Sequence, residues 1–280
     1  MSRLISRRTF LGSLVAAGAT SGYARLIEPQ WLDITTRRIP IGRTAGPPLR
    51  VLHLSDLHAS DVVPLPQIAH AISLGLQQKP DVVFLTGDFV TRRRADLAQY
   101  SAVLRPLAAA APTFACAGNH DGGSWAHRFG GYPDLDAISR LCADSGIDLL
   151  QNTHRQVTIA GRPWQFVGLG DIWADDGRAS EAFAGLARVP GVSRLVLSHN
   201  PDSKEMLEPY EWDAAFFGHT HGGQFYLPLV GAPFAPVVDK RFIAGLYRWS
   251  DRWLHISRGV GNLHGVRFNC RPEITLVEVS

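Results

Sequence analysis

The sequence predicts an α/β fold with four layers, α/β/β/α, in which two mixed β-sheets pack face to face and helices flank them. Strand and helix patterns alternate in residues 49–117, which is typical of a parallel layer with covering helices. From residue 148 onward strand patterns dominate and supply a second sheet. A chain of 280 residues with 45% hydrophobic and 19% charged residues fits one large globular α/β domain, or a domain with a leader.

The first half of the chain reads as strands joined by helices. Weak alternation of apolar residues predicts a strand in residues 31–41, and the turn-forming Gly46-Pro47-Pro48 separates it from the next strand. Pro80 and Pro112 stop the helices, because proline cannot continue the helical hydrogen-bond ladder. The expected elements are strands at residues 49–55, 81–86 and 113–117 and helices at residues 66–78 and 95–110.

The second half begins with a glycine- and aromatic-rich stretch, residues 122–133, which predicts a loop over the site. A helix at residues 135–145 ends at Gly146, and a turn at Gly161-Arg162-Pro163 predicts a hairpin. The remaining pattern predicts helices at 178–188 and 204–207 and strands at 157–159, 164–167, 194–197, 214–217, 242–249, 253–257 and 274–279.

The N-terminus carries the pattern of an export signal. Ser6-Arg7-Arg8-Thr9-Phe10-Leu11 precedes a run of apolar and small residues at 12–19, which is typical of a twin-arginine leader. This run is shorter than the roughly 20 apolar residues of a spanning helix. We expect residues 1–30 to form a twin-arginine-type signal or N-terminal anchor, and residues 31–280 to form the functional domain. An ordinary amphipathic helix is the alternative.

A twin-arginine signal predicts export through the twin-arginine machinery to the periplasm or cell envelope. Whether the leader is cleaved is open, because residues 17–19 and 22–24 both suit cleavage and an uncleaved leader would act as a membrane anchor.

The charge balance argues against a nucleic-acid partner. The formal net charge is only +3, and part of this excess comes from Arg3, Arg7 and Arg8 in the leader. The three cysteines are widely spaced and odd in number, so they predict small buried residues rather than a zinc ribbon or a disulfide framework. They are Cys116, Cys142 and Cys270.

Five predicted strands run directly into polar residues of the kinds that bind metals. Such strand ends suggest one composite site at one edge of a sheet. Each residue taken singly has a structural alternative as a turn residue, a loop cap or a core histidine, but their joint occurrence favours a metal site. The candidates are Asp56 and His58, Asp88, Asn119 with His120, His199, and His219 with His221.

These donors are carboxylate and amide oxygens and imidazole nitrogens, a mixture that suits manganese, iron or zinc. Asp56 and His58 can converge on one cation, and the two oxygens of Asp88 can bridge two cations. Two ions about 3.5–4 Å apart can clamp the attacking and leaving oxygens of a phosphoryl transfer. His120 is not needed as a ligand, so it can act as a general acid or steady the developing charge.

Five motifs resemble the complete motif set of the calcineurin-like metallophosphoesterase superfamily. The resemblance covers residues 49–280. The Gly-Gly-Gln that follows the double histidine is similar to a branch that includes exported phosphoesterases and enzymes similar to UDP-2,3-diacylglucosamine hydrolase. The motifs are Asp-Leu-His at 56–58, Gly-Asp at 87–88, Gly-Asn-His-Asp at 118–121, Ser-His-Asn-Pro-Asp at 198–202 and Gly-His-Thr-His-Gly-Gly-Gln at 218–224.

The resemblance implies the metallophosphoesterase sandwich, two divalent metal ions and a metal-bridged hydroxide as the nucleophile. It implies His120 as the catalytic acid or phosphate contact. It assigns Asp56, His58, Asp88 and His221 to one metal, and Asp88, Asn119, His199 and His219 to the other.

One position departs from the protein-phosphatase branch of the superfamily, which has an aspartate three residues after the bridging aspartate. Here Thr91 stands at that position, which argues against a protein phosphatase and leaves the orientation of His120 without an explanation. Asp121 could contribute, although a turn role is at least as well supported, and Asp171 has the same two interpretations.

The favoured interpretation is a dinuclear metal-dependent phosphoesterase that hydrolyses a phosphoester or pyrophosphate bond, with a lipid-linked or UDP-sugar-lipid substrate as one class. A nucleotide-linked lipid precursor would be met in the cytoplasm, so either the leader is only an anchor or the substrate is an envelope phosphoester. The alternatives are an exported phosphodiesterase or nuclease, and an envelope binding protein with structural metals.

Two apolar stretches bear on the substrate and on a membrane surface as a partner. The aromatic residues Trp125, Phe129 and Tyr132 and the apolar stretch 225–238 could accept a lipid or a membrane surface. Packing in the core is the alternative.

Overall fold

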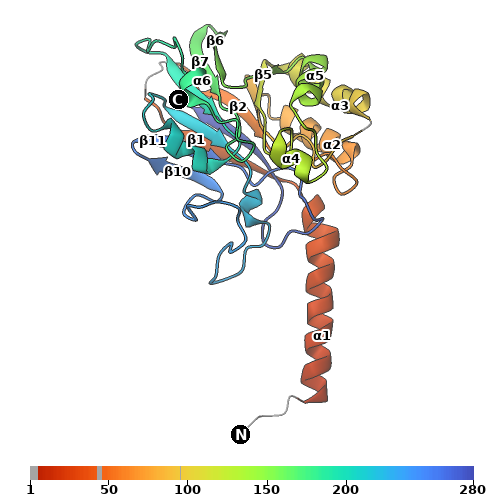
Figure 1. Ribbon diagram of the computed structural model, residues 1–280. Coiled ribbons are helices and arrows are strands. Elements are labelled where there is room, and N and C mark those ends of the chain that lie inside the picture. Colours follow the sequence, from red (N-terminus) through yellow and green to blue (C-terminus); the bar gives the residue numbers. More distant parts are fainter. Residues whose placement is uncertain (1–5, 43–45, 95) are drawn as a thin grey trace.

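A computed structural model describes residues 6–42, 46–94 and 96–280. Arg3 of the leader and Ala95 of the second expected helix lie outside the described residues. The body of the molecule is a layered α/β sandwich, and one long helix leaves it near the N-terminus (Figure 1). The helices are α1 (Arg7–Gly22), α2 (Leu65–Leu76), α3 (Leu97–Ala110), α4 (Ser124–Arg128), α5 (Asp136–Ser145), α6 (Ala179–Ala182) and α7 (Lys204–Leu207).

The first sheet has six strands in the order β1-β12-β2-β3-β4-β5. Strands β2 to β5 are parallel, β12 runs antiparallel to β2, and β1 is parallel to β12, so the sheet is mixed. The strands are β1 (Asp33–Ile39), β2 (Leu49–Leu54), β3 (Val82–Thr86), β4 (Thr113–Cys116), β5 (Asp148–Leu149) and β12 (Glu273–Val279).

The second sheet also has six strands, in the order β10-β11-β9-β8-β7-β6. Strands β11, β9, β8 and β7 are parallel, and the two outer strands are antiparallel to their neighbours. The strands are β6 (Thr153–Ile159), β7 (Arg162–Gly168), β8 (Ser193–Leu197), β9 (Ala214–Phe217), β10 (Gly245–Trp249) and β11 (Arg252–Ile256).

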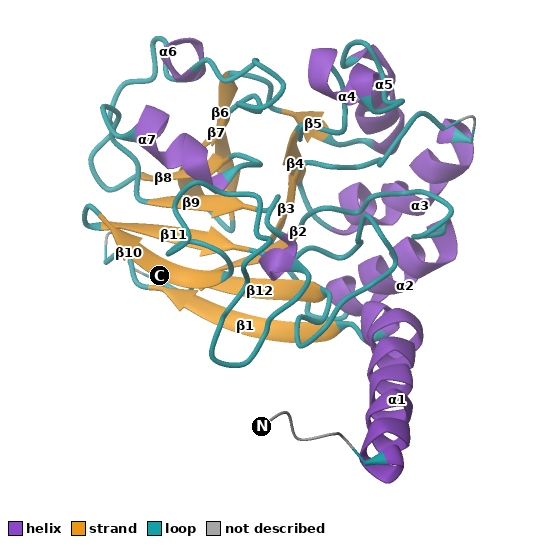
Figure 2. Ribbon diagram, turned by 60° about the horizontal axis from the view of Figure 1, so that its bottom comes forward, coloured by secondary structure: helices purple, strands orange, loops and turns teal. Residues whose placement is uncertain are grey.

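Three large apolar clusters fill the space between the layers, which confirms the predicted four layers, and a fourth, small cluster lies at Ala232, Ala235 and Val237. Phe84, Phe166 and Phe216 pack edge to face between the two sheets. Helices α2, α3 and α5 cover the other face of the first sheet, and α6 and α7 lie against the second (Figure 2). The central strands are apolar on both faces, and such strands are stable only when both faces of the sheet are covered.

Several predicted elements have different bounds. The expected loop 122–133 contains the short helix α4. The expected helix 178–188 is only α6, which ends at Ala182, because the C-cap Phe183 leaves helical angles (φ −98°, ψ 0°) and Gly185 follows with φ +70°. The hairpin turn is Ala160-Gly161, both with positive φ, so Arg162 belongs to β7. A two-residue turn of this hand matches the right-handed twist of the flanking strands. Strand β5 was not predicted, and the strand expected from residue 242 begins at Gly245.

The three cysteines are buried and free, as predicted. Among the described residues, no helix combines the length and the apolar character needed to cross a membrane.

Candidate metal centre

The candidate ligands meet at one edge of the sandwich, where β2, β3 and β4 of the first sheet and β8 and β9 of the second sheet end. All seven predicted metal ligands are buried there, with exposed fractions of at most 4%. They are Asp56, His58, Asp88, Asn119, His199, His219 and His221. The structure therefore brings together every residue that the sequence assigned to the metals.

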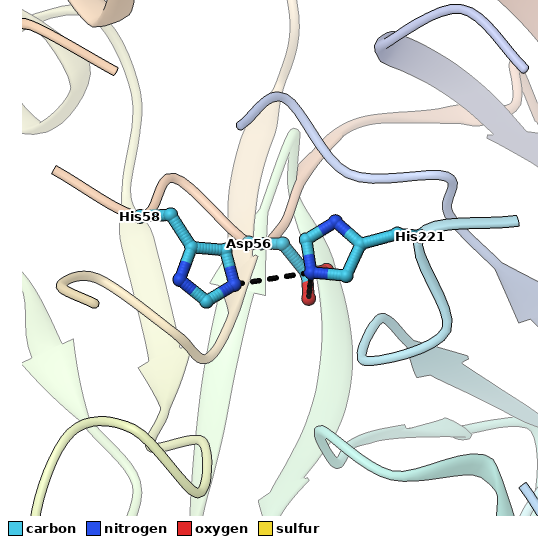
Figure 3. Close-up of side chains that lie close together, drawn as sticks. All are labelled: Asp56, His58 and His221. Atoms are coloured by element: carbon cyan, nitrogen blue, oxygen red, sulfur yellow. Dashed lines mark hydrogen bonds and ion pairs between the residues drawn. The ribbon is translucent and has the colours of Figure 1, made fainter. Parts of the chain in front are cut away.

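Asp56, His58 and His221 form the first group (Figure 3). His58 Nε2 lies 3.1 Å from His221 Nε2, and His221 Nε2 lies 3.4 Å from Asp56 Oδ1. These three atoms come from a loop after β2 and a loop after β9, so the group forms only when the two sheets are packed together.

Asp88 lies between this group and a second one. Its Oδ2 atom is 3.2 Å from His58 Nε2 and also 3.2 Å from His199 Nε2. His219 Nδ1 is 3.2 Å from His199 Nε2. The position of Asp88 suits a carboxylate that bridges two cations.

The orientation of the imidazoles leaves one ring nitrogen of each pointing into the site. His199 Nδ1 donates to the Thr86 carbonyl at 2.8 Å, and His219 Nε2 donates to the Pro236 carbonyl at 3.0 Å. A carbonyl oxygen can only accept, so in the neutral form of each ring the other nitrogen carries the lone pair and faces the site. Metal-binding histidines usually have this arrangement. Burial opposes the charged form of His199, but Asp88 and the other nearby carboxylates outweigh it and raise its pKa well above the usual value, so a cation would displace a proton from this ring.

Burial also favours neutral imidazoles at two of these positions. Burial lowers the pKa of His58 to about 4 and that of His219 to about 3. A neutral imidazole is the form that binds a metal.

Asp56 and Asp88 differ in the direction in which their surroundings shift the pKa. Burial raises the pKa of Asp56 to about 7. Burial also disfavours the charged form of Asp88, but His199 and the other nearby imidazoles outweigh this effect and hold its pKa well below the usual range. A site that contains two buried carboxylates is stabilised by a bound cation.

Asn119 gives an independent sign of a missing partner. Its Oδ1 atom is buried and accepts no hydrogen bond. A buried polar atom normally has a partner, and a carbonyl oxygen beside carboxylates and imidazoles suits a divalent cation. The described residues therefore fit divalent metal ions chemically.

Asp121 holds the strand-end loops together. Its carboxylate accepts backbone N–H bonds from Gly118, Asp88 and Phe89 at 2.7–2.8 Å. Gly118 permits the close approach, because a Cβ atom at this position would lie 2.3 Å from Asp88 Oδ1. Asp121 thus has the turn role and fixes the backbone of Asp88. Asp171 caps a turn in a similar way, accepting from the backbone N–H groups of Trp173 and Ala174.

His120 is held by contacts that the sequence did not reveal. Its Nδ1 donates to the Thr91 backbone carbonyl at 3.1 Å, and its ring meets the Trp125 ring edge to face at 4.6 Å. The Thr91 hydroxyl lies 3.2 Å from His58 Nδ1 instead. A backbone carbonyl at Thr91 therefore orients His120, where the protein-phosphatase branch has a carboxylate.

A pocket of about 370 Å³ lies directly over these residues. Asp88, Asn119, His120 and His219 form part of its wall, and the rest is mainly apolar and aromatic. Of the predicted aromatic loop, Trp125 lines the pocket, but the Tyr132 hydroxyl bonds to the backbone of Arg94. The apolar part consists of Trp125, Trp173, Phe225, Phe234, Pro236 and Leu263.

Sequence reasoning missed Trp173 as a wall of this pocket. Its ring contacts that of His219 with 4.4 Å between centroids. A signal was present, because Gly170-Asp171 comes one residue after the end of the apolar strand β7, and Gly87-Asp88 comes directly after β3.

Comparisons with known proteins agree with this geometry. The model of the calcineurin-like phosphoesterase family matches residues 49–223. Phosphodiesterase YaeI of Escherichia coli is 44% identical over 99% of this chain and 100% of its own length. The uncharacterized metallophosphoesterase YkoQ of Bacillus subtilis is 29% identical over 88% of this chain and 91% of its own. The UDP-2,3-diacylglucosamine pyrophosphatase LpxG of Chlamydia trachomatis is 28% identical over 94% of each chain.

Proposed function

The chain belongs to the calcineurin-like phosphoesterase family and is a metal-dependent phosphoester hydrolase, and we propose that its substrate is a lipid-linked phosphodiester or pyrophosphate. The apolar pocket carries this proposal. A substrate that places its phosphate on the metal ligands would place its neighbouring group among Trp125, Trp173 and Phe234. An acyl or polyprenyl chain fits such a wall, because burying apolar surface is the main source of its affinity.

The relatives are consistent with this substrate class. LpxG is named for the hydrolysis of a pyrophosphate in a diacylated sugar nucleotide, and YaeI is named a phosphodiesterase. For the present chain we propose the chemistry that these names share, cleavage of a P–O bond, and we propose the apolar neighbouring group from the pocket wall.

We propose two divalent metal ions, with manganese, iron or zinc favoured by the donor set. Asp56, His58, Asp88 and His221 would hold one, and Asp88, Asn119, His199 and His219 the other. When bound, the ions would supply positive charge to the phosphoryl oxygens and activate the attacking water.

His120 would then act on the leaving group. Its Nδ1–H donates a hydrogen bond to the Thr91 carbonyl, so Nε2 is the ring nitrogen that can contact the substrate. In the imidazolium form, Nε2 also carries a proton, which from the pocket wall can pass to the departing oxygen and leave a neutral ring, or hydrogen-bond to a phosphoryl oxygen. Trp125 keeps the ring in place and excludes water from one side.

The test is hydrolysis by metal-stripped protein with manganese, zinc, iron or magnesium added back. The substrates are bis-p-nitrophenyl phosphate, a UDP-linked diacylated sugar and the same UDP-sugar without acyl chains. We expect metal-dependent turnover that favours the acylated substrate and is lost in His120→Ala. Equal turnover of both UDP-sugars would contradict a lipid-linked substrate, and two bound ions without any turnover would favour a binding role.

Trp173→Ala isolates the pocket from the metals. We expect about a tenfold rise in KM for the acylated substrate, since removing a large aromatic wall loses roughly 1–2 kcal/mol of apolar contact. Hydrolysis of bis-p-nitrophenyl phosphate should change much less. Trp249→Ala is the matched control, because Trp249 stacks on Trp212 at the opposite end of the second sheet.

We further propose export through the twin-arginine pathway to the cell envelope. Arg7 and Arg8 begin α1, a helix that projects from the body of the molecule as a separable leader would (Figure 1). Replacing both with lysine should leave the protein in the cytoplasm on cell fractionation, whereas the same change at Arg37 and Arg38 should not. Unchanged export of the Arg7/Arg8 variant would contradict the proposal.

A further inference from the structure

The segment between η4 (His221–Gly223) and β10 exposes its larger apolar side chains, whereas Ala232, Ala235 and Val237 form a small buried cluster at its base. Residues 221–238 contain no Asp, Glu, Lys or Arg. Large side chains of this segment are more than half exposed, which is unusual for a water-facing loop. They are Tyr226 at 52%, Leu229 at 108%, Val230 at 66%, Phe234 at 72% and Val238 at 89%.

A hydrogen-bonded turn presents the tip of this segment outward. Leu227 and Gly231 exchange two backbone hydrogen bonds of 2.8 Å, and Leu229 lies between them with φ +68°. A positive φ is unfavourable for a bulky side chain. The turn therefore holds Leu229 and Val230 away from the body, although burial would stabilise both.

The base of the segment is joined to the N-terminal segment through residues 267–270. Asn269 Nδ2 donates to the Tyr226 carbonyl at 3.2 Å, and the Asn269 backbone N–H donates to Glu28 Oε2 at 3.0 Å. The Arg267 backbone N–H donates to the Ala24 carbonyl at 2.9 Å. The loop and α1 accordingly extend from the same side of the molecule (Figure 1).

The charges around this side are mainly positive. Residues 6–27 contain Arg7, Arg8 and Arg25 and no acidic residue, and Lys240 and Arg241 follow the loop. The nearby acid Asp239 is paired with Arg241 at 2.7 Å and lies 3.6 Å from Lys204, and Glu28 is fully buried. Asp202 accepts from the backbone N–H groups of Val238 and Asp239 at 2.7 and 3.3 Å.

Trp31 adds an aromatic ring to the same side. It is 48% exposed at the base of the N-terminal segment, and the Arg271 guanidinium lies over its ring. Apolar tips, half-exposed aromatic rings and an excess of basic over acidic side chains are the features of a surface that binds the interface of an anionic bilayer.

We propose that residues 225–238, with Trp31 and the basic residues beside it, form a docking surface for an anionic lipid bilayer. Leu229 and Val230 enter the interfacial region, and Arg25, Lys240 and Arg241 contact lipid phosphates.

Docking would also place the active-site pocket at the membrane. Phe234 and Pro236 of the same segment line the pocket, and the Pro236 carbonyl holds His219. A lipid-linked substrate could then enter without crossing water. This consequence rests on the proposed function, whereas the docking surface itself does not.

The first experiment reads the loop directly. The full chain carrying Leu229→Cys is labelled with an environment-sensitive fluorophore, which is selective because the native cysteines are buried. We expect a blue shift and an increase in emission with vesicles of equal parts phosphatidylglycerol and phosphatidylcholine, and a smaller change with phosphatidylcholine alone. Met206→Cys on α7, 38% exposed, is the matched control and should not respond. No response at position 229 while the protein sediments with the vesicles would overturn the proposal, since α1 would then be the contact.

The second experiment uses the double variant Leu229→Asp/Val230→Asp. We expect its vesicle partition coefficient to fall about tenfold or more, because two apolar side chains are lost from the interface. Val189→Asp/Met206→Asp, at other exposed apolar positions, should have no such effect. A dimer without lipid that the first double variant abolishes would overturn the proposal in favour of a second copy as the occupant.

Both binding measurements remain valid for a protein that hydrolyses no lipid. If Leu229→Asp/Val230→Asp no longer binds vesicles but still hydrolyses the soluble acylated substrate, the docking surface is supported independently of the proposed function. If vesicle binding is normal and no lipid-linked substrate is cleaved, only the proposed function fails.

Discussion

At the scale of single residues, the metal centre is made of strained backbone. Asp56, His58, Asp88, His219 and His221 all have positive φ, between 48° and 67°. Aspartate and histidine tolerate this region better than most residues, but each such position still costs about 1 kcal/mol or more. The strain persists because strand ends, glycine neighbours and the Asp121 carboxylate fix the loops, and it turns the side chains of consecutive strand ends toward one point.

Replacing Asp88 with asparagine tests the bridging role. The variant keeps an oxygen for the His120 backbone N–H but loses the negative charge shared by both proposed cations. We expect bound metal to fall from two ions toward one or none, and turnover to fall at least tenfold, about 1.4 kcal/mol or more of transition-state stabilisation. Elemental analysis and turnover should be measured together.

Asp213→Asn is the matched control for this variant, because Asp213 is a buried carboxylate paired with Arg188 away from the site. Full activity of the Asp88 variant with two bound ions would refute the bridging assignment.

Gly218→Ala tests how tightly the ligands are packed. A Cβ atom there would lie 1.8 Å from Ser55 Oγ and 2.3 Å from Asp56 Oδ2, so Asp56 must move. We expect a loss of about 1–3 kcal/mol in the free energy of unfolding and weaker metal binding. Denaturant unfolding with and without metal measures both. Gly18→Ala, with open space around the Cβ position, should change neither, and an unchanged Gly218→Ala protein would show that the loop has more room than the structure indicates.

At the scale of elements, a pair of buried histidines joins the two sheets below the metal centre. His53 of β2 and His255 of β11 have their Nδ1 atoms 2.9 Å apart, and His53 Nε2 lies 2.8 Å from the Thr86 hydroxyl. The Thr86 carbonyl in turn holds His199. Burial lowers the pKa of His53 well below its usual value and that of His255 to about 4.

This pair predicts a pH dependence of stability. The unfolded pKa of histidine is about 6.5, so between about pH 6.5 and pH 4 the unfolded chain binds more protons than the folded one at His255. The free energy of unfolding must therefore fall as the pH falls through this window. Replacing His255 with asparagine should flatten the slope by up to one proton, about 1.4 kcal/mol per pH unit.

Urea unfolding of the metal-free parent and of the His255→Asn variant from pH 4 to pH 7 measures the two slopes. Their difference removes the contribution of the other histidines. Identical slopes would mean that His255 is already protonated in the fold or that it titrates normally.

At the scale of the whole molecule, the site lies where two sheets and their loops meet, and the chain crosses from one sheet to the other to build it. Asp56 and Asp88 come from the first sheet, and His199, His219 and His221 from the second. Bound metal would therefore act as a link between the sheets as well as a cofactor, and it would offset the cost of burying several carboxylates in one place.

Removing the metals should therefore lower thermal stability. A ligand present at about 100 times its Kd adds about 2.7 kcal/mol to the folded state, which for a chain of this size corresponds to several degrees in Tm. Calorimetry should show a lower Tm after chelation and recovery on adding manganese. An unchanged Tm would indicate that the metals do not bridge the two sheets.

The sequence by itself determined the layered α/β class, most strands and all seven candidate ligands with His120, because these depend on local apolar runs and on the residue types at their ends. It could not give the short length of α6, which depends on the backbone angles after Ala182, or strand β5, which forms by pairing with β4. It also left open what orients His120. The backbone carbonyl of Thr91 and the ring of Trp125 do so, and every residue has a backbone carbonyl, so the sequence cannot indicate which one is used. The pocket wall and the exposed tip at Leu229 were decided by tertiary structure for the same reason. Whether an apolar side chain is core, pocket or surface depends on what packs against it.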